Sequence, residues 1–161
     1  MPKFSHLLVF STFMISVAAA GASAGAAVGY DLSNPSSTGC ASKGVVQYPA
    51  TARAYGPFSI RLRRSTTCNT VWAHITRTDT KRCQAGGLNC AQIRLTRTLG
   101  NGTKTATGWR KMAGGTKAVL SLQLNGMNDA KYVANASTFG GTTIGASGTI
   151  SVDRNGNWSS S

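Results

Sequence analysis

The stretch FSIRLRRSTTCNTVWAHIT, residues 58–76, decides the fold class of this chain. In residues 58–63, apolar and polar side chains alternate strictly. The alternation returns in residues 71–76, where Val71, Ala73 and Ile75 share one face. A period of two puts the apolar side chains of a β-strand on one face and the polar ones on the other. The stretch therefore predicts two strands, each with one face toward a core.

Outside this stretch, the same alternation predicts strands over residues 92–96 and 132–136. Two further predicted rows of inward side chains are Leu120, Leu122 and Leu124, and Ile144, Ala146, Ile150 and Val152. Glycine-rich turn signals separate the segments at 99–103, 113–116, 139–142 and 154–157. No segment after the first 24 residues shows a convincing helical stripe, and the absence of Glu also disfavours helix. The fold class is therefore all-β, a small antiparallel sandwich or barrel.

The predicted domain organisation begins with an export signal at residues 1–24. Lys3 supplies a positive start, and a largely apolar, uncharged run follows at 7–20. The A-x-A pattern at 22–24 is typical of a cleavage site. The run is shorter than the roughly 20 residues needed to span a bilayer. We therefore expect a secreted protein, extracellular or associated with the cell surface, with an extended lead-in at 25–38, one β domain at 39–154 and a polar tail at 155–161.

Four cysteines follow the predicted signal: Cys40, Cys68, Cys83 and Cys90. An even number in an exported chain predicts two disulfides, for which three connectivities are open. We favour Cys40–Cys68 and Cys83–Cys90, because two glycines between the last two cysteines can turn the chain. The alternative is a zinc site, which the spacing disfavours because the chain has no C-x-x-C pair. We expect neither a metal nor a cofactor.

The charge of the chain is strongly unbalanced, with 17 Lys and Arg against 4 acidic residues and a net charge of +13. Such an excess exceeds what ion pairing within the chain can use, so it favours contact with a polyanion. If the predicted strands lie beside one another, their outward arginines form one positive face. The candidate anion-binding residues are Arg61, Arg63, Arg64, Arg94, Arg97, Arg110 and Lys111.

Two tryptophans are candidate aromatic contacts. Trp72 shares a strand face with His74 by period, and we interpret it as a side chain that covers the core beside the Cys40–Cys68 bridge. Trp109 lies next to two cations, so it either stacks on a sugar or a base or packs in a short strand. The sequence leaves these alternatives for Trp109 open.

The supply of catalytic groups is small. Apart from His6 in the predicted signal, His74 is the only histidine, and the four acids are all Asp, scattered among turns. General acid–base chemistry and glycoside hydrolysis need paired groups that this composition hardly provides. The sequence therefore predicts a protein that is not an enzyme.

A longer pattern connects the chain to a known family. The motif D-x-x-N-P at 31–35 is followed by G-C at 39–40 and by I-R-L-R-R-S-x-x-C-x-x-x-W-A-x-I at 60–75. Together with the segment at 124–130, these motifs resemble a bacterial extracytoplasmic family catalogued as domain of unknown function 2690. The resemblance spans most of residues 30–136. It implies a secreted protein or an outer domain of a membrane-anchored regulator, and it implies no activity.

The chain departs from the family pattern at three positions. Tyr30 stands where the family has its first Cys, Arg61 where it has an acid, and His74 where it has an Arg. The missing Cys leaves an even set, which supports the Cys40–Cys68 pairing.

Three functional hypotheses follow. The first is a secreted, cationic, non-enzymatic protein that binds an anionic polymer of the cell envelope or extracellular matrix: cell wall, lipid headgroup or nucleic acid. The alternative is a secreted cationic toxin or inhibitor that acts on competing cells. A small hydrolase or nuclease that depends on His74 is the least favoured.

Overall fold

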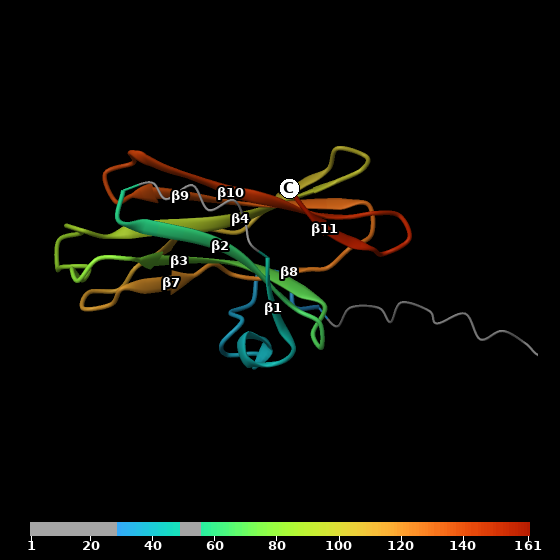
Figure 1. Cartoon of the computed structure of the whole chain (residues 1–161), viewed down its shortest axis with the longest axis horizontal. Coiled ribbons are helices and arrows are strands. Elements are labelled where there is room, and N and C mark those ends of the chain that lie inside the picture. Colours follow the sequence, from blue (N-terminus) through green and yellow to red (C-terminus); the bar gives the residue numbers. More distant parts are fainter. Residues whose placement is uncertain (1–28, 49–55) are drawn as a thin grey trace, which may run out of the picture.

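The computed structural model describes residues 29–48 and 56–161, which form two antiparallel β-sheets that pack face to face (Figure 1). Sheet A has the order β1-β2-β3-β7, with β8 also paired to β3; its strands are β1 (Val45–Tyr48), β2 (Phe58–Ser65), β3 (Thr70–Arg77), β7 (Ala118–Leu120) and β8 (Leu124–Asn125). Sheet B has the order β11-β10-β9-β4-β5, with β6 also paired to β4; its strands are β4 (Ala91–Leu99), β5 (Lys104–Ala106), β6 (Arg110–Lys111), β9 (Ala130–Thr138), β10 (Thr143–Val152) and β11 (Trp158–Ser160). One short 3-10 helix, η1 (Cys40–Ser42), precedes β1. The predicted all-β class is confirmed.

The alternating stretch at residues 58–76 forms the β2–β3 hairpin at the centre of sheet A. β2 and β3 pair antiparallel along their whole length, with Ile60 opposite Ile75 and Leu62 opposite Ala73. All four of these side chains are fully buried. The predicted inward faces of both strands are therefore confirmed.

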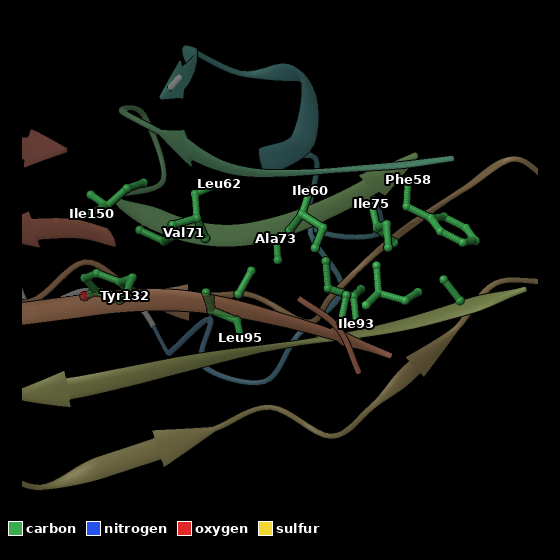
Figure 2. Packing of buried hydrophobic residues seen from close by; sticks show 14 of the residues in the cluster. Phe58, Ile60, Leu62, Val71, Ala73, Ile75, Ile93, Leu95, Tyr132 and Ile150 are labelled. Carbon is green, nitrogen blue, oxygen red and sulfur yellow. The ribbon is translucent and has the colours of Figure 1, made fainter. Parts of the chain in front are cut away.

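The core lies between the two sheets, where inward side chains of β2 and β3 meet those of β4, β9 and β10 (Figure 2). The contribution of β4 includes Ile93 and Leu95, and both are fully buried. Burying one such side chain stabilises the fold by roughly 1.5–3 kcal/mol. Tyr132 brings a hydroxyl into this core, where it accepts a hydrogen bond from the Met127 amide and donates one to the Asn125 carbonyl. Its polar group is therefore satisfied, and its ring packs as an apolar body.

Both favoured disulfides form. Cys40–Cys68 joins η1 to the turn between β2 and β3, with 5.8 Å between the Cα atoms. Cys83–Cys90 closes the short loop before β4, with 4.5 Å between the Cα atoms, and both of its cysteines are buried in the core.

The described part of the lead-in, residues 29–38, is a series of turns and not the extended segment that the sequence predicted. Its backbone is tied to the segment before β8: the Leu32 amide donates to the Gln123 carbonyl, and the Gln123 amide donates to the Ser33 carbonyl. Asp31 additionally forms an ion pair with β4. The lead-in is thus part of the domain, and the boundary at residue 39 was wrong. The predicted signal at 1–24 and the start of the lead-in lie outside the described residues.

The predicted polar tail was also wrong, because residues 158–160 form β11 at the edge of sheet B. Trp158 pairs with Val152 in register, and its indole ring stacks on Tyr132 with 6.0 Å between the ring centroids. The turn signal at 154–157 reverses the chain so that this strand can pair. The contact of half-buried Trp158 with buried Tyr132 therefore outweighs the polar composition of the segment.

Two predicted inward rows are interrupted. After β7, the Ser121 hydroxyl accepts a hydrogen bond from the Ala73 amide in place of a regular backbone pairing. The row of three leucines is broken here, and of the three only Leu124 is fully buried. In β10, register shifts on either side of Ala146 turn this residue to solvent. Strict alternation fails at such irregularities because extra residues on one strand change which face the next side chain takes.

Candidate anion-binding site

The predicted cationic residues do not form one positive face. Arg61 and Arg63 lie on β2 of sheet A, whereas Arg94 lies on β4 and Lys111 on β6 of sheet B. The inner faces of the two sheets meet across the core, so their outer faces point in opposite directions (Figure 1). A single positive face was expected only if these strands lie beside one another, and this condition is not met because they belong to different sheets.

Arg97 is not available for a ligand. It follows Ile93 and Leu95 on the inward face of β4 and is only 5% exposed. Its guanidinium forms a two-point ion pair with Asp31 at 3.1 and 3.2 Å, and it also donates to the Asn125 carbonyl. Arg97 therefore anchors the lead-in to sheet B, which corrects its assignment as an anion contact.

Arg64 has a structural contact as well. It has the inward parity of β2, and its guanidinium lies 3.8 Å from the ring centroid of Trp158. Trp158 in turn stacks on Tyr132. This stack joins β2 of sheet A to β11 and β9 of sheet B, so half-buried Arg64 helps to hold the two sheets together.

Trp72 is fully buried, so it packs inside the fold and offers no exposed stacking surface. Its ring lies on the face of β3 opposite Val71 and Ala73, with the Arg63 guanidinium 5.9 Å from the ring centroid. The other candidate tryptophan, Trp109, is 40% exposed.

Arg94 and Trp109 lie together in a hollow of about 530 Å³ on the outer face of sheet B. The floor of the hollow consists of residues that face one another across strands β4 and β9: Gln92 lies opposite Ser137, and Arg94 lies opposite Asn135. Outward positions of neighbouring strands share a face, so these polar side chains form two adjacent rows. On the β10 side, the lining consists of small residues: Gly141, Thr143, Gly145 and Ala146.

The hollow combines an aromatic wall with a guanidinium. The Arg94 guanidinium lies 4.7 Å from the Trp109 ring centroid, a cation–π distance that orients both side chains. The Gln92 amide donates to the Ser137 hydroxyl at 2.9 Å, which fixes that amide in the floor. The described residues that line the hollow include no carboxylate. Its chemistry therefore suits an anion or a polar ring, and it disfavours a cation.

The two candidate cations of β6 are not among the residues that line the hollow. Lys111 lies opposite Gln92 in register, and its ammonium lies 5.3 Å from the Phe139 ring centroid. Arg110 pairs with Ile93, is half-buried and does not line the hollow.

A second hollow, of about 520 Å³, lies on the outer face of sheet A and contains Arg61, Arg63 and His74. Arg61 is exposed and donates to the Gln47 side chain at 3.1 Å. His74 forms a hydrogen bond with the Thr76 hydroxyl through Nε2. Burial, together with the positive charges of Arg63 and Arg61, lowers the pKa of His74 from 6.5 to about 4. His74 is therefore neutral at neutral pH.

The four aspartates have structural partners. Asp31, Asp79 and Asp129 form ion pairs with Arg97, Arg77 and Arg154. Asp153 accepts hydrogen bonds from the backbone and side chain of Asn157 and from the Asn155 amide, and these bonds lower its pKa. Over residues 29–48 and 56–161, no group of three or more metal-ligating His, Cys, Asp or Glu side chains comes together.

Sequence reasoning identified Arg94 and Trp109 but missed the two amides beside them. Gln92 and Asn135 sit at outward positions of strands that the alternation had predicted. The signal that could have found them was polar amides at outward positions of two predicted strands, although only the pairing of β4 with β9 brings them together.

The comparisons with known proteins add one finding. The model of the family described as Protein of unknown function (DUF2690) matches residues 28–144. The search of curated proteins and the search of solved structures found no match. No helix within the described residues has the length and apolarity that a membrane crossing requires.

Proposed function

This chain belongs to that family of proteins of unknown function, and we propose that it is a secreted, non-enzymatic protein that binds an anionic polymer through the outer face of sheet B. The observation that carries the proposal is the Arg94–Trp109 pair in a hollow without carboxylates among its described lining residues. Of the candidate arginines, Arg94 combines a place in an open hollow with an exposed aromatic partner. Arg64 and Arg97 are instead engaged between elements of the fold.

The net charge supports this proposal through long-range attraction. A chain of +13 raises the local concentration of a polyanion at its surface and accelerates association at low salt. Such attraction alone is weak and unspecific at physiological ionic strength, where the screening length is about 8 Å. The hollow adds the short-range contacts that long-range electrostatic attraction does not provide.

The covalent structure supports a place outside the cell. Both cysteine pairs are oxidised in the structure, and disulfides persist in oxidising compartments. The predicted signal at residues 1–24 agrees with this location. We therefore place the polymer at the cell surface or in the extracellular matrix.

The proposal includes that the protein is not an enzyme. His74 is flanked by two arginines, and its low pKa makes it a weak base at neutral pH. Three aspartates pair with arginines and the fourth organises a turn. These engagements leave little for acid–base chemistry, which supports a binding role.

The test compares Arg94→Gln with Arg154→Gln, a matched control that removes the same charge from an exposed position outside the hollow. Retention on immobilised anionic polymer is measured over a salt series. We expect Arg94→Gln to weaken binding several-fold and to lower the salt slope by about one counterion, while Arg154→Gln changes binding little. Equal effects of the two variants would mean that only net charge matters, and the proposed site would be wrong.

A further inference from the structure

We infer that the hollow on sheet B binds an acidic sugar unit of a polysaccharide, with the carboxylate on Arg94 and one face of the ring against Trp109. This inference rests on the proposed function and names the class of polymer. Three features of the hollow carry it: an exposed aromatic wall, a guanidinium without an acidic partner among the described residues, and neutral amides beside the guanidinium.

The wall is the first feature. Trp109, a large aromatic side chain immediately before the short strand β6, keeps 40% of its surface exposed. The Arg94 guanidinium at 4.7 Å holds the ring in place. A ring held in this way offers a flat, apolar face with a polar edge. A pyranose matches such a face because its axial C–H groups form an apolar side while its hydroxyls point outward.

The guanidinium is the second feature. Arg77 and Arg97 are buried, and each forms an ion pair with an aspartate of the chain. Arg94 forms no ion pair within the described residues, and its buried Nε has no hydrogen-bond partner there. A guanidinium fork matches a carboxylate with two parallel hydrogen bonds. The guanidinium of Arg94 can therefore bind the carboxylate of a ligand, whereas those of Arg77 and Arg97 already bind carboxylates of the chain.

The amides are the third feature. Gln92 and Asn135 border Arg94 in the floor, and Ser137 and Thr143 add hydroxyls. Neutral amides both donate and accept, so they suit the hydroxyls of a sugar, which do the same. A volume of about 530 Å³ falls in the range of sites that enclose small organic ligands. It leaves room for a ring and its substituents.

Other polyanions fit these features less well. A phosphodiester chain gains affinity from a row of cations that follows its backbone, whereas the described lining of the hollow contains Arg94 as its one cation. Duplex nucleic acid presents a convex, continuous backbone and no free ring to enter a hollow. A lipid surface favours a wide apolar or basic patch, whereas this lining combines a single tryptophan with polar amides and hydroxyls.

The experiment measures binding of the exported chain, without the predicted signal at residues 1–24, to polygalacturonate, neutral dextran, polyphosphate and a short DNA duplex at about 0.15 M salt. The variants are Arg94→Gln, Arg94→Lys, Trp109→Ala and Trp109→Phe, with Arg154→Gln as the charge-matched control. Thermal unfolding of each variant verifies that it is folded.

We expect polygalacturonate to bind most tightly and dextran to bind at least tenfold more weakly. Arg94→Gln and Trp109→Ala should each weaken polygalacturonate binding about tenfold or more. Trp109→Phe should retain most of the affinity. Arg94→Lys should lose several-fold, because an ammonium keeps the charge but not the fork.

Two results would overturn the inference in distinguishable ways. If polyphosphate or DNA binds most tightly and Trp109→Ala has no effect while Arg94→Gln still weakens binding, the acidic sugar is wrong and the proposed function stands. If the wild-type chain binds none of the anionic polymers at this salt concentration, the inference and the proposed function are both wrong.

Discussion

The stability of this protein should fall as the pH decreases from 7 to 5, and a single side chain should cause the fall. Burial and two neighbouring arginines lower the pKa of His74 from 6.5 to about 4 in the folded chain. In the unfolded chain His74 regains its ordinary pKa, so between these values the unfolded state binds more protons. The stabilisation is therefore complete above pH 6.5 and is lost as the pH falls toward 4.

The magnitude follows from the two pKa values. For a shift from 6.5 to about 4, the free energy of unfolding should drop by about 1.8 kcal/mol between pH 7 and pH 5. Because the His74 side chain is partly exposed, solvent screening reduces this to between about 1 and 1.8 kcal/mol. The two aspartates with shifted pKa values do not contribute to the change in stability between pH 7 and pH 5. Hydrogen bonds lower the pKa of Asp79 and Asp153, so their effect appears only at still lower pH.

The groups that face His74 define the variants. Arg61 is its cross-strand partner on β2, Arg63 lies beside it, and Leu120 of β7 is its uncharged neighbour on the other side. His74→Gln removes the titrating group, so its stability should be flat from pH 7 to pH 5. Arg61→Gln with Arg63→Gln should raise the pKa of His74 only part of the way to 6.5, because burial is the larger cause.

The assay is urea unfolding at half-unit pH intervals, combined with an NMR titration of the His74 imidazole. His6 lies in the predicted signal, so the exported chain carries His74 as its one histidine. The reasoning is refuted if wild type and His74→Gln show the same slope of stability with pH, or if His74 titrates at or above pH 6.

Three further predictions concern elements that the sequence alone did not place. Asp31→Ala should cost about 2–4 kcal/mol in urea unfolding, because it leaves the Arg97 guanidinium buried without its counter-ion; a cost below 0.5 kcal/mol would mean that the lead-in is not held by this pair. Replacing Cys83 and Cys90 together with Ser should cost about 2.5 kcal/mol, the loop-entropy value for eight residues, and no loss of thermal stability would contradict this. Trp158→Ala should cost about 3 kcal/mol by removing the ring between two sheets, whereas a tail outside the domain would tolerate it.

Much of the fold was predictable because it depends on local pattern. The parity of β2, β3 and β4 follows from alternation within eight or nine residues. The Cys83–Cys90 bridge follows from a short loop with two glycines. Even the role of Arg97 was within reach, since it has the same parity as Ile93 and Leu95.

The candidate site was predictable only in part. Arg94 and Trp109 stood out in the sequence as a cation and an exposed aromatic candidate, but they lie 15 positions apart along the chain (109 − 94). Their contact depends on how the chain returns from β5 to β6 along β4. Asn135 joins them only because β9 pairs with β4 on the other side.

By itself, the sequence determined the fold class, the inward faces of the central strands, the even cysteine set and the excess of positive charge. These properties depend on composition and on neighbours within a few residues. Only the tertiary structure decided which sheet each strand joins, and hence that the outward arginines Arg61, Arg63 and Arg94 divide between two opposite faces. It also decided that Asp31 neutralises Arg97 and that Trp158 packs against Tyr132 and Arg64. These contacts join segments far apart in the chain, so they form only after the strands have paired, and a pattern within a few residues cannot predict them.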